Sequence, residues 1–232
     1  MTISVWITRT EPGASRSAAA WRDAGFEPVV APLLEVRPIT HETGSARPFI
    51  PAFTSANAVR HAGIEPSGPA LVIGDATGMA AREAGFEPIV LGRGDVKSMA
   101  QALVTAARDS KSLSQDVDIA ETPVIHFSGV RLAGDLVDAL RTGGLRAERV
   151  CVYETVPVKA LPTFESPPTI LALYSPFAAE TFMRLSPPAW SGLAACLSPA
   201  VAEPLRGRRV VVAEQPTQAA LIEAVRKEMD SG

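Results

Sequence analysis

The stretch Val150-Cys151-Val152-Tyr153-Glu154-Thr155-Val156-Pro157-Val158 decides how this chain is organised. Its apolar and β-branched residues favour extended backbone, and Pro157 prevents it from continuing as a central strand. An earlier stretch, residues 33–39, has the same character and also runs into a proline. Units of alternating strands and helices flank both stretches. We therefore predict that the chain passes between two lobes at these two places, and that a ligand binds in the cleft beside them.

Strand-like and helix-like segments alternate along both halves of the chain. A buried strand over residues 2–7 leads through Pro12 into a helix over residues 13–24, and a second strand follows. The plan returns roughly 120 residues later, where Phe53-Thr54-Ser55-Ala56 falls opposite Leu173-Tyr174-Ser175-Pro176. This spacing suits a duplicated domain. The alternation predicts an α/β fold of two doubly wound parallel sheets, with flavodoxin-like lobes.

The same patterns predict the remaining elements. Strands are expected at residues 27–31, 50–53, 70–73, 88–91, 123–127, 149–152, 169–173, 194–197 and 209–213, and helices at 76–84, 98–108, 131–142 and 217–229. Residues 41–48 and 109–122 are polar and unpatterned, which predicts loops. Gly92-Arg93-Gly94 lacks the other residues of a phosphate loop, so we interpret it as a tight turn.

The composition argues against several classes of function. The formal net charge is −3, which disfavours general attraction to nucleic acid. No apolar run reaches membrane length and no signal-peptide pattern is present, so we expect a cytoplasmic protein that does not bind membranes. Cys151 and Cys196 each lie in an apolar run and are expected to be reduced, buried thiols. The histidines show no metal-ligand spacing, so we expect no metal site.

Small polar residues follow predicted strands at six places. In open parallel sheets these turns lie at the carboxyl ends of the strands, where ligands bind. Each presents unpaired backbone N–H groups and the positive end of a helix dipole, which suit carboxylates or phosphates. For any single turn a plain helix cap is the simpler interpretation, but six together favour a multiply anionic ligand held between the lobes. The turns are Arg9-Thr10, Ser55, Asp75, Ser128-Gly129, Ser175 and Ser198.

Three side chains near these turns need separate interpretation. Arg9 is either a solvated charge or a clamp for a carboxylate, and the sequence favours neither. Tyr153 leaves its strand beside the crossing. Packing is the commoner role for such a residue, although a phenol that faces the cleft is able to donate a proton. Tyr174 ends a strand and is interpreted as a core residue.

The order and spacing of several short motifs resemble uroporphyrinogen-III synthase over nearly the whole chain. The motifs are Thr8-Arg9 with Pro12, Phe53-Thr54-Ser55-Ala56-Asn57-Ala58-Val59, Ile73-Gly74-Asp75-Ala76-Thr77, Val152-Tyr153-Glu154-Thr155, Ser175-Pro176-Phe177-Ala178 and Pro216-Thr217. The resemblance implies two α/β lobes joined by a two-stranded β-ladder hinge. Lobe 1 would be discontinuous, residues 1–36 and 159–232, and lobe 2 would be inserted, residues 37–158, including the crossing strands.

The resemblance also implies a cofactor-independent cyclising lyase of tetrapyrrole, porphyrin and heme biosynthesis. Its substrate would be hydroxymethylbilane, a linear tetrapyrrole polycarboxylate, and the reaction would close the macrocycle with loss of water and inversion of ring D. The leaving hydroxyl needs only a weak acid, so the harder task is to hold the reacting ends together. Besides the substrate, the implied partner is the preceding pathway enzyme, in transient contact, and we expect a monomer that binds no nucleic acid.

By the same resemblance, Tyr153 donates the proton to the leaving hydroxyl. The resemblance also implies that Ser55, Thr77 and Ser175 line the cleft. The strand exits and the resemblance together predict a substrate-binding set of Arg9, Thr54, Ser55, Asn57, Ala58, Gly74, Thr77, Ser128, Gly129, Ser175, Phe177, Ala178 and Val201. One position departs from the family, because Val201 stands where its Gly-x-x-Thr pattern places a threonine. That departure favours a rival interpretation, a non-catalytic two-lobed protein that binds an anionic metabolite or a tetrapyrrole. A nucleotide-dependent transferase is disfavoured, since no phosphate-loop signature is present.

Overall fold

The computed structural model describes residues 3–42, 48–91, 95–109, 118–132, 134–186 and 190–230. The chain forms two compact units, unit 1 (Met1–Glu35 and Val156–Gly232) and unit 2 (Val36–Thr155). The predicted turn Gly92-Arg93-Gly94 lies outside the described residues, as do 43–47 and 110–117 of the two predicted loops. None of the helices described is both long and apolar enough to cross a membrane.

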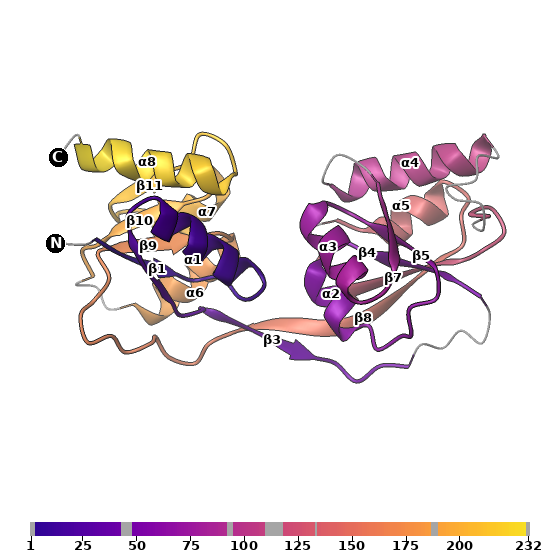
Figure 1. The fold of residues 1–232 in the computed structure, drawn as a ribbon, viewed down its shortest axis with the longest axis horizontal. Helices are drawn as coiled ribbons and strands as arrows, with labels where there is room; N and C mark the ends of the chain where they lie inside the picture. Colours follow the sequence, from indigo (N-terminus) through magenta and orange to yellow (C-terminus); the bar gives the residue numbers. More distant parts are fainter. Residues whose placement is uncertain are drawn as a thin grey trace. The chain divides into compact units, whose positions relative to one another are not determined.

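Unit 1 is built on a five-stranded sheet that joins the two ends of the chain. Its strands are β1 (Ser4–Ile7), β2 (Glu27–Val30), β9 (Ile170–Leu173), β10 (Leu193–Cys196) and β11 (Val210–Val212). They lie in the order β11-β10-β9-β1-β2, and all four neighbouring pairs are parallel. In Figure 1 the indigo N-terminal strand lies beside the orange strands from the second half of the chain.

Unit 2 contains a six-stranded sheet in the order β3-β8-β7-β4-β5-β6. The strands are β3 (Leu34–Pro38), β4 (Ile50–Phe53), β5 (Pro69–Val72), β6 (Glu87–Val90), β7 (Val124–Gly129) and β8 (Ala147–Pro157). The pairs from β8 to β6 are parallel. The predicted pair of parallel sheets is therefore confirmed. Strands β3 and β8 carry the chain between the units, at the two prolyl stretches that the sequence singled out.

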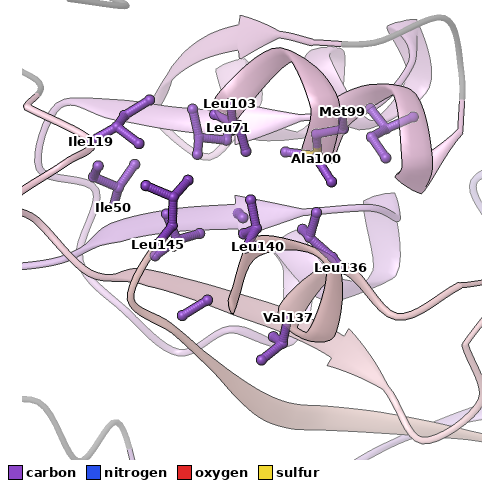
Figure 2. Packing of buried hydrophobic residues seen from close by; sticks show 14 residues of the cluster. Ile50, Leu71, Met99, Ala100, Leu103, Ile119, Leu136, Val137, Leu140 and Leu145 are labelled. Carbon is purple, nitrogen blue, oxygen red and sulfur yellow. The ribbon is translucent and has the colours of Figure 1, made fainter. Parts of the chain in front are cut away.

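Helices cover both faces of each sheet. In unit 1, α1 (Gly13–Asp23) and α8 (Gln218–Asp230) share one core with the sheet, while α6 (Pro176–Leu185), α7 (Pro199–Ala202) and the 3-10 turn Glu203–Leu205 share the other. In unit 2, α2 (Ala56–His61) and α3 (Asp75–Glu83) cover one face, and α4 (Val96–Arg108) and α5 (Leu136–Thr142) cover the other. Figure 2 shows Met99 and Leu103 of α4 meeting Leu136 and Leu140 of α5 over the sheet.

The two sheets have the same spatial plan, as the internal repeat predicts. Phe53 ends β4 and its counterpart Leu173 ends β9, so β6-β5-β4-β7-β8 corresponds to β11-β10-β9-β1-β2. When the strands are numbered in chain order, unit 1 has the 2-1-3-4-5 arrangement of flavodoxin. The five corresponding strands of unit 2, β4 to β8, have the arrangement 3-2-1-4-5. The units are circular permutations of one plan, because the chain enters them at different strands.

Two predicted serine caps are confirmed, and two predicted helix starts are corrected, because α4 begins at Val96 rather than Ser98 and α5 begins later than expected. Ser55 and Ser175 cap α2 and α6, accepting hydrogen bonds from the amides of Ala58 and Ala178. The helix expected to begin at Arg131 begins only at Leu136, where the Asp135 side chain accepts from the Asp138 amide at 3.0 Å. The residues between β7 and Asp135 favour helix in isolation, but the Val130 amide donates to the carbonyl of Tyr153 and holds the chain against β8.

Candidate functional site

Unit 2 has a topological switch point between β4 and β7. From β4 the chain winds outward to β5 and β6, and from β7 it winds the other way to β8. Ligands of open parallel sheets bind beside the carboxyl ends of the strands at such a point. A cavity of about 290 Å³ lies there. Its lining residues are Thr54, Ser55, Ile73, Asp95, Val96, Ser128, Gly129, Arg131, Leu132, Gly134 and Tyr153.

A larger hollow of about 730 Å³ lies at the amino ends of the strands of the same sheet, beside Pro48, Pro123 and Ala147. These residues stand before or at the start of β4, β7 and β8, and no predicted site residue lines the hollow. Its walls include an exposed ion pair of Arg146 with Glu121, 3.7 Å apart, which is a weak and solvated contact. We therefore take the smaller cavity, where five predicted residues meet, as the candidate site.

A bulge in β8 brings Tyr153 to the cavity. Ser128 pairs with Cys151, but the next residue of β7, Gly129, pairs with Tyr153, so β8 carries one extra residue at this point. Bulges of this kind re-aim side chains next to functional sites. The phenol oxygen of Tyr153 lies 3.0 Å from the Ser55 hydroxyl, and either group is able to donate. Ser55 also accepts from the Ala58 amide at 3.2 Å, so the helix cap fixes the hydroxyl that holds the phenol.

Gly129 is needed for the position of the Tyr153 ring. A Cβ atom at Gly129 would lie 2.6 Å from Cζ of Tyr153 and 2.9 Å from its hydroxyl oxygen. Contacts this short force the ring or the strand to move. The glycine therefore allows the close approach of the Tyr153 ring.

Replacing Gly129 with alanine should lower turnover about tenfold in the cyclisation that the family resemblance implies, because the added methyl group displaces the phenol, and misplacement by about an ångström costs up to roughly a hundredfold. Gly78→Ala is the matched control. Its Cβ would meet only ordinary contacts, 3.5 Å from Val90, inside α3. It should leave turnover unchanged and raise the free energy of unfolding by about 0.5–1 kcal/mol. Equal turnover in both variants would remove Gly129 from the site.

His126 lies behind the cavity, in the middle of β7. Its side chain is fully buried, and Nε2 is 3.0 Å from the Thr54 hydroxyl oxygen, while Nδ1 has no hydrogen-bond partner among the described residues. Burial lowers the pKa of His126 to about 4, the positive charge of Arg149 adds to the effect, and Asp135 opposes it. The imidazole is therefore neutral at physiological pH.

Arg149, on the neighbouring strand β8, donates hydrogen bonds to residues at the carboxyl end of β7. Its Nε donates to the Ser128 hydroxyl at 2.9 Å, and Nη2 donates to the carbonyls of Gly129 at 2.7 Å and Val130 at 2.9 Å. Arg149 is the direct β8 partner of His126 in the strand register. The Arg149 guanidinium thus fixes Ser128 and adds to the effect of burial, which is the main cause of the lowered pKa of His126.

The corresponding switch point of unit 1 lies between β1 and β9. Here the Arg9 guanidinium stacks on the Tyr174 ring, 4.7 Å from its centroid, and donates to the Ser17 hydroxyl at 3.4 Å. Burial lowers the pKa of Arg9 and raises the pKa of Tyr174. Tyr174 is half-buried, and its hydroxyl accepts from Trp21 Nε1 at 3.0 Å. Arg9 is therefore a half-buried cation rather than a fully solvated one; its role toward a carboxylate stays a prediction.

Ser175 gives a direct test of the cap interpretation. Ser175→Ala should lower the free energy of unfolding by about 1 kcal/mol, because the Ala178 amide loses its 3.2 Å acceptor. Ser175→Asp should restore it, since an aspartate caps equally well. Urea unfolding measures both. Unchanged stability in the alanine variant would mean that Ser175 is held for a purpose other than capping.

The other predicted residues do not line the cavity. On α2, Asn57 is half-buried and Ala58 is buried. Gly74 caps α3 with φ 73°, and Thr77 is buried on the same helix. On α6, Phe177 is half-buried and Ala178 is buried. Val201 is 2% exposed and packs into the core of unit 1 with Phe182 and Leu205. A side chain at this position is a core residue of unit 1, so the departure from the family pattern removes no hydroxyl from the cavity.

Sequence reasoning missed His126, Arg149, Arg131 and Asp95. Of these, Arg131 and Asp95 line the cavity. The Asp95 carboxylate caps α4, accepting from the Ser98 amide at 2.8 Å, which lowers its pKa. A cap signal at Asp95, three residues before Ser98, was present in the sequence. Nothing in the sequence marks His126, because its run reads as an ordinary buried strand.

Both cysteines are free. Cys196 is buried, and burial raises the pKa of its thiol to about 12, whereas Cys151 is half-buried rather than fully buried. Within the described ranges, no group of three or more His, Cys, Asp or Glu side chains is placed to hold a metal ion.

Comparison with known proteins adds a family and a fold. The protein-family model described as uroporphyrinogen-III synthase HemD matches residues 15–223. No curated protein sequence matches the chain. A crystal structure of uroporphyrinogen-III synthetase from Helicobacter pylori is similar over 98% of this chain and 100% of that one, with a TM-score of 0.58 and 15% identity. A crystal structure of a mutant uroporphyrinogen III synthase from Thermus thermophilus aligns over 100% of this chain and 100% of that one, with a TM-score of 0.49 and 15% identity.

The family match spans nine-tenths of the chain and includes β4 and β7 of the unit 2 switch point, together with β9 but not β1 of the unit 1 switch point. The Helicobacter pylori structure supports the fold alone, at its low identity. The chain belongs to the uroporphyrinogen-III synthase family, the cofactor-independent cyclising lyases of tetrapyrrole biosynthesis.

Proposed function

We propose that the unit 2 cavity is where this synthase holds the reacting end of its substrate. As a member of its family, the chain cyclises hydroxymethylbilane with loss of water and inversion of ring D. The observation that carries the proposal is the meeting of Thr54, Ser55, Ser128, Gly129 and Tyr153 in one cavity at the switch point of the sheet. Ser128 and Gly129 lie in β7, Tyr153 lies in β8, and Thr54 and Ser55 follow β4; strand exits and family resemblance together predict this set.

Tyr153 is the proton donor of this proposal. Departure of the terminal hydroxyl leaves a resonance-stabilised azafulvenium cation, so a phenol is acid enough to assist. The Ser55 hydroxyl, 3.0 Å away, donates to the phenol oxygen as negative charge develops there. General acid catalysis of this kind contributes about a hundredfold or more to a rate. Among the described residues that line the cavity, the one carboxyl group is that of Asp95, and it caps α4 by accepting from the Ser98 amide.

The polar walls suit part of a polycarboxylate. Thr54 and Ser128 supply hydroxyls and Arg131 supplies a cation. At about 290 Å³ the cavity is near the lower limit of small-molecule sites, about 300–1,000 Å³. It therefore takes the reacting end with its carboxylates and leaves the rest of the tetrapyrrole outside.

The test is the identity of the product isomer. Hydroxymethylbilane, made enzymatically, is given to the purified protein, and the porphyrinogens are oxidised and separated by chromatography. We expect the type III isomer, with the type I isomer in a sample without protein, because uncatalysed closure proceeds without inversion. Type I alone in both samples would overturn the proposed reaction. Binding without conversion would support the rival, non-catalytic interpretation, which the burial of Val201 no longer favours.

We further propose that the protein acts as a cytoplasmic monomer, in transient contact with the enzyme that supplies its labile substrate. Two free cysteines are in keeping with a reducing compartment. We also propose two lobes that fold as units, one formed by residues 1–36 with 159–232 and the other by residues 37–158. Separate expression of residues 37–158 tests whether the second lobe folds by itself. Sedimentation at micromolar concentration tests the monomer, and a dimer under those conditions would contradict it.

A further inference from the structure

The imidazole of His126 stands where the duplicated fold uses an aliphatic side chain. Ala52 pairs with His126 in unit 2, and its counterpart Ala172 pairs with Ile7 in unit 1. Ile7 is fully buried, and so is His126, yet Nδ1 of the histidine has no partner among the described residues. An orphaned buried polar atom is unfavourable. The fold does not need an imidazole here, so its purpose lies with what it touches, the Thr54 hydroxyl.

The tautomer of His126 follows from this geometry. A neutral imidazole carries one N–H, on Nδ1 or on Nε2. With the proton on Nδ1, a buried N–H would be left without an acceptor. With the proton on Nε2, the N–H donates to Thr54 across the 3.0 Å contact and only a lone pair is left over. Orphaned N–H groups are rarer in proteins than under-used acceptors. The Nε2–H tautomer is therefore favoured, and Thr54 accepts.

Ser128 is in the same situation for a different reason. A guanidinium has donors only, so the 2.9 Å contact of Arg149 Nε makes the Ser128 oxygen an acceptor. Two carbonyls hold the same guanidinium in place. The oxygen of each hydroxyl thus accepts a hydrogen bond, from His126 at Thr54 and from Arg149 at Ser128. In the part of the chain that the structure describes, neither has an acceptor for its own proton.

We propose that His126 and Arg149 are positioning residues, which turn the hydroxyls of Thr54 and Ser128 into a pair of O–H donors for one carboxylate of the substrate. The inference rests on the proposed function, because it names the chemical group that the cavity receives. Both hydroxyls lie at the carboxyl ends of the neighbouring strands β4 and β7 and line the cavity. The Asp95 carboxylate also lines it, but is engaged with α4, and Arg131 adds a positive charge.

The first test needs neither a variant nor an activity. In protein labelled with ¹⁵N in the histidine rings, the two ring nitrogens of a neutral imidazole differ strongly in chemical shift, and the one bearing the proton is identified directly. At pH 7.5 we expect His126 as the Nε2–H tautomer. The Nδ1–H tautomer, or an imidazolium, would overturn the proposal, since Thr54 would then either donate to the histidine or face a charged one. The result stands whether or not the chain makes the type III isomer.

The second test asks whether His126 acts through Thr54. His126→Leu should raise KM for hydroxymethylbilane about tenfold in the native background but less than twofold in a Thr54→Val background. His126→Gln, whose amide is able to donate, should recover part of the loss. A merely structural role would raise KM by the same factor in both backgrounds, and that result overturns the proposal. The parallel cycle of Arg149→Met with Ser128→Ala tests the second hydroxyl in the same way.

Thr181→Val is the matched control for removing a buried hydroxyl. Thr181 lies on α6 in unit 1 and donates to the Phe177 carbonyl at 2.8 Å. We expect its KM to equal that of the native protein. Failure of the native protein to make the type III isomer would reject the proposed function, and the tautomer measurement would still decide the assignment of His126.

Discussion

Replacing Tyr153 with phenylalanine should lower kcat about a hundredfold while KM and the fold stay close to native. The variant keeps the ring that packs on Gly129 and loses only the hydroxyl, which lies 3.0 Å from Ser55. The leaving hydroxyl must then depart with water as its only acid, and a factor of this size is the low end of what a positioned acid contributes. Steady-state kinetics with hydroxymethylbilane measure kcat and KM separately, so loss of proton donation is distinguished from loss of binding.

Tyr174→Phe is the control for this change, since the chain has two tyrosines. The Tyr174 hydroxyl belongs to unit 1, where it accepts from Trp21. Its loss should cost about 1 kcal/mol of unfolding free energy through that hydrogen bond, with little effect on kcat. If Tyr153→Phe leaves kcat unchanged, or if both variants slow turnover equally, Tyr153 is not the proton donor.

The sequence was informative wherever the signal was local or repeated. Ser55 and Ser175 lie between a buried strand and a helix, which is enough to place a cap. The roughly 120-residue correspondence of Phe53 with Leu173 placed β4 and β9 at equivalent centres of their sheets. Arg9 and Ser55 were predicted as site residues because each follows a predicted strand. Periodicity and duplication therefore accounted for the sheets and for the positions of the strand exits.

The positions of Tyr153 and His126 at the cavity depend on contacts that sequence periodicity does not encode. Tyr153 meets Gly129 because of one extra residue in β8, and no residue type announces that bulge. His126 reads as one polar residue in an apolar strand, and only its complete burial and unpartnered nitrogen set it apart. The same limit explains the misplaced start of α5, where a backbone hydrogen bond from Val130 to Tyr153 outweighs local helix propensity. These contacts join residues that are far apart in sequence.

The burial of His126 should make the protein sensitive to acid by about 3 kcal/mol. Its pKa is about 4 in the folded protein against an ordinary 6.5. Between these values the unfolded chain binds a proton that the folded protein refuses, so the free energy of unfolding falls as pH falls. The buried imidazole has no effect of this kind above pH 6.5. Its destabilising effect on the folded protein grows from pH 6.5 to about pH 4 and changes no further below that. The span of about 2.5 pH units converts to about 3 kcal/mol.

Urea unfolding of the native protein, His126→Leu and His126→Gln at several values between pH 7.5 and pH 4 isolates this term. All other titrating groups are shared, so the difference between native and variant curves reports the imidazole alone. Both variants should lose the extra acid sensitivity, although leucine and glutamine differ in stability at neutral pH. Native and variant curves that run parallel down to pH 4 would show that the imidazole accepts a proton in the folded state. A charged His126 would face Arg149 across the strand pair and would leave Thr54 no neutral partner.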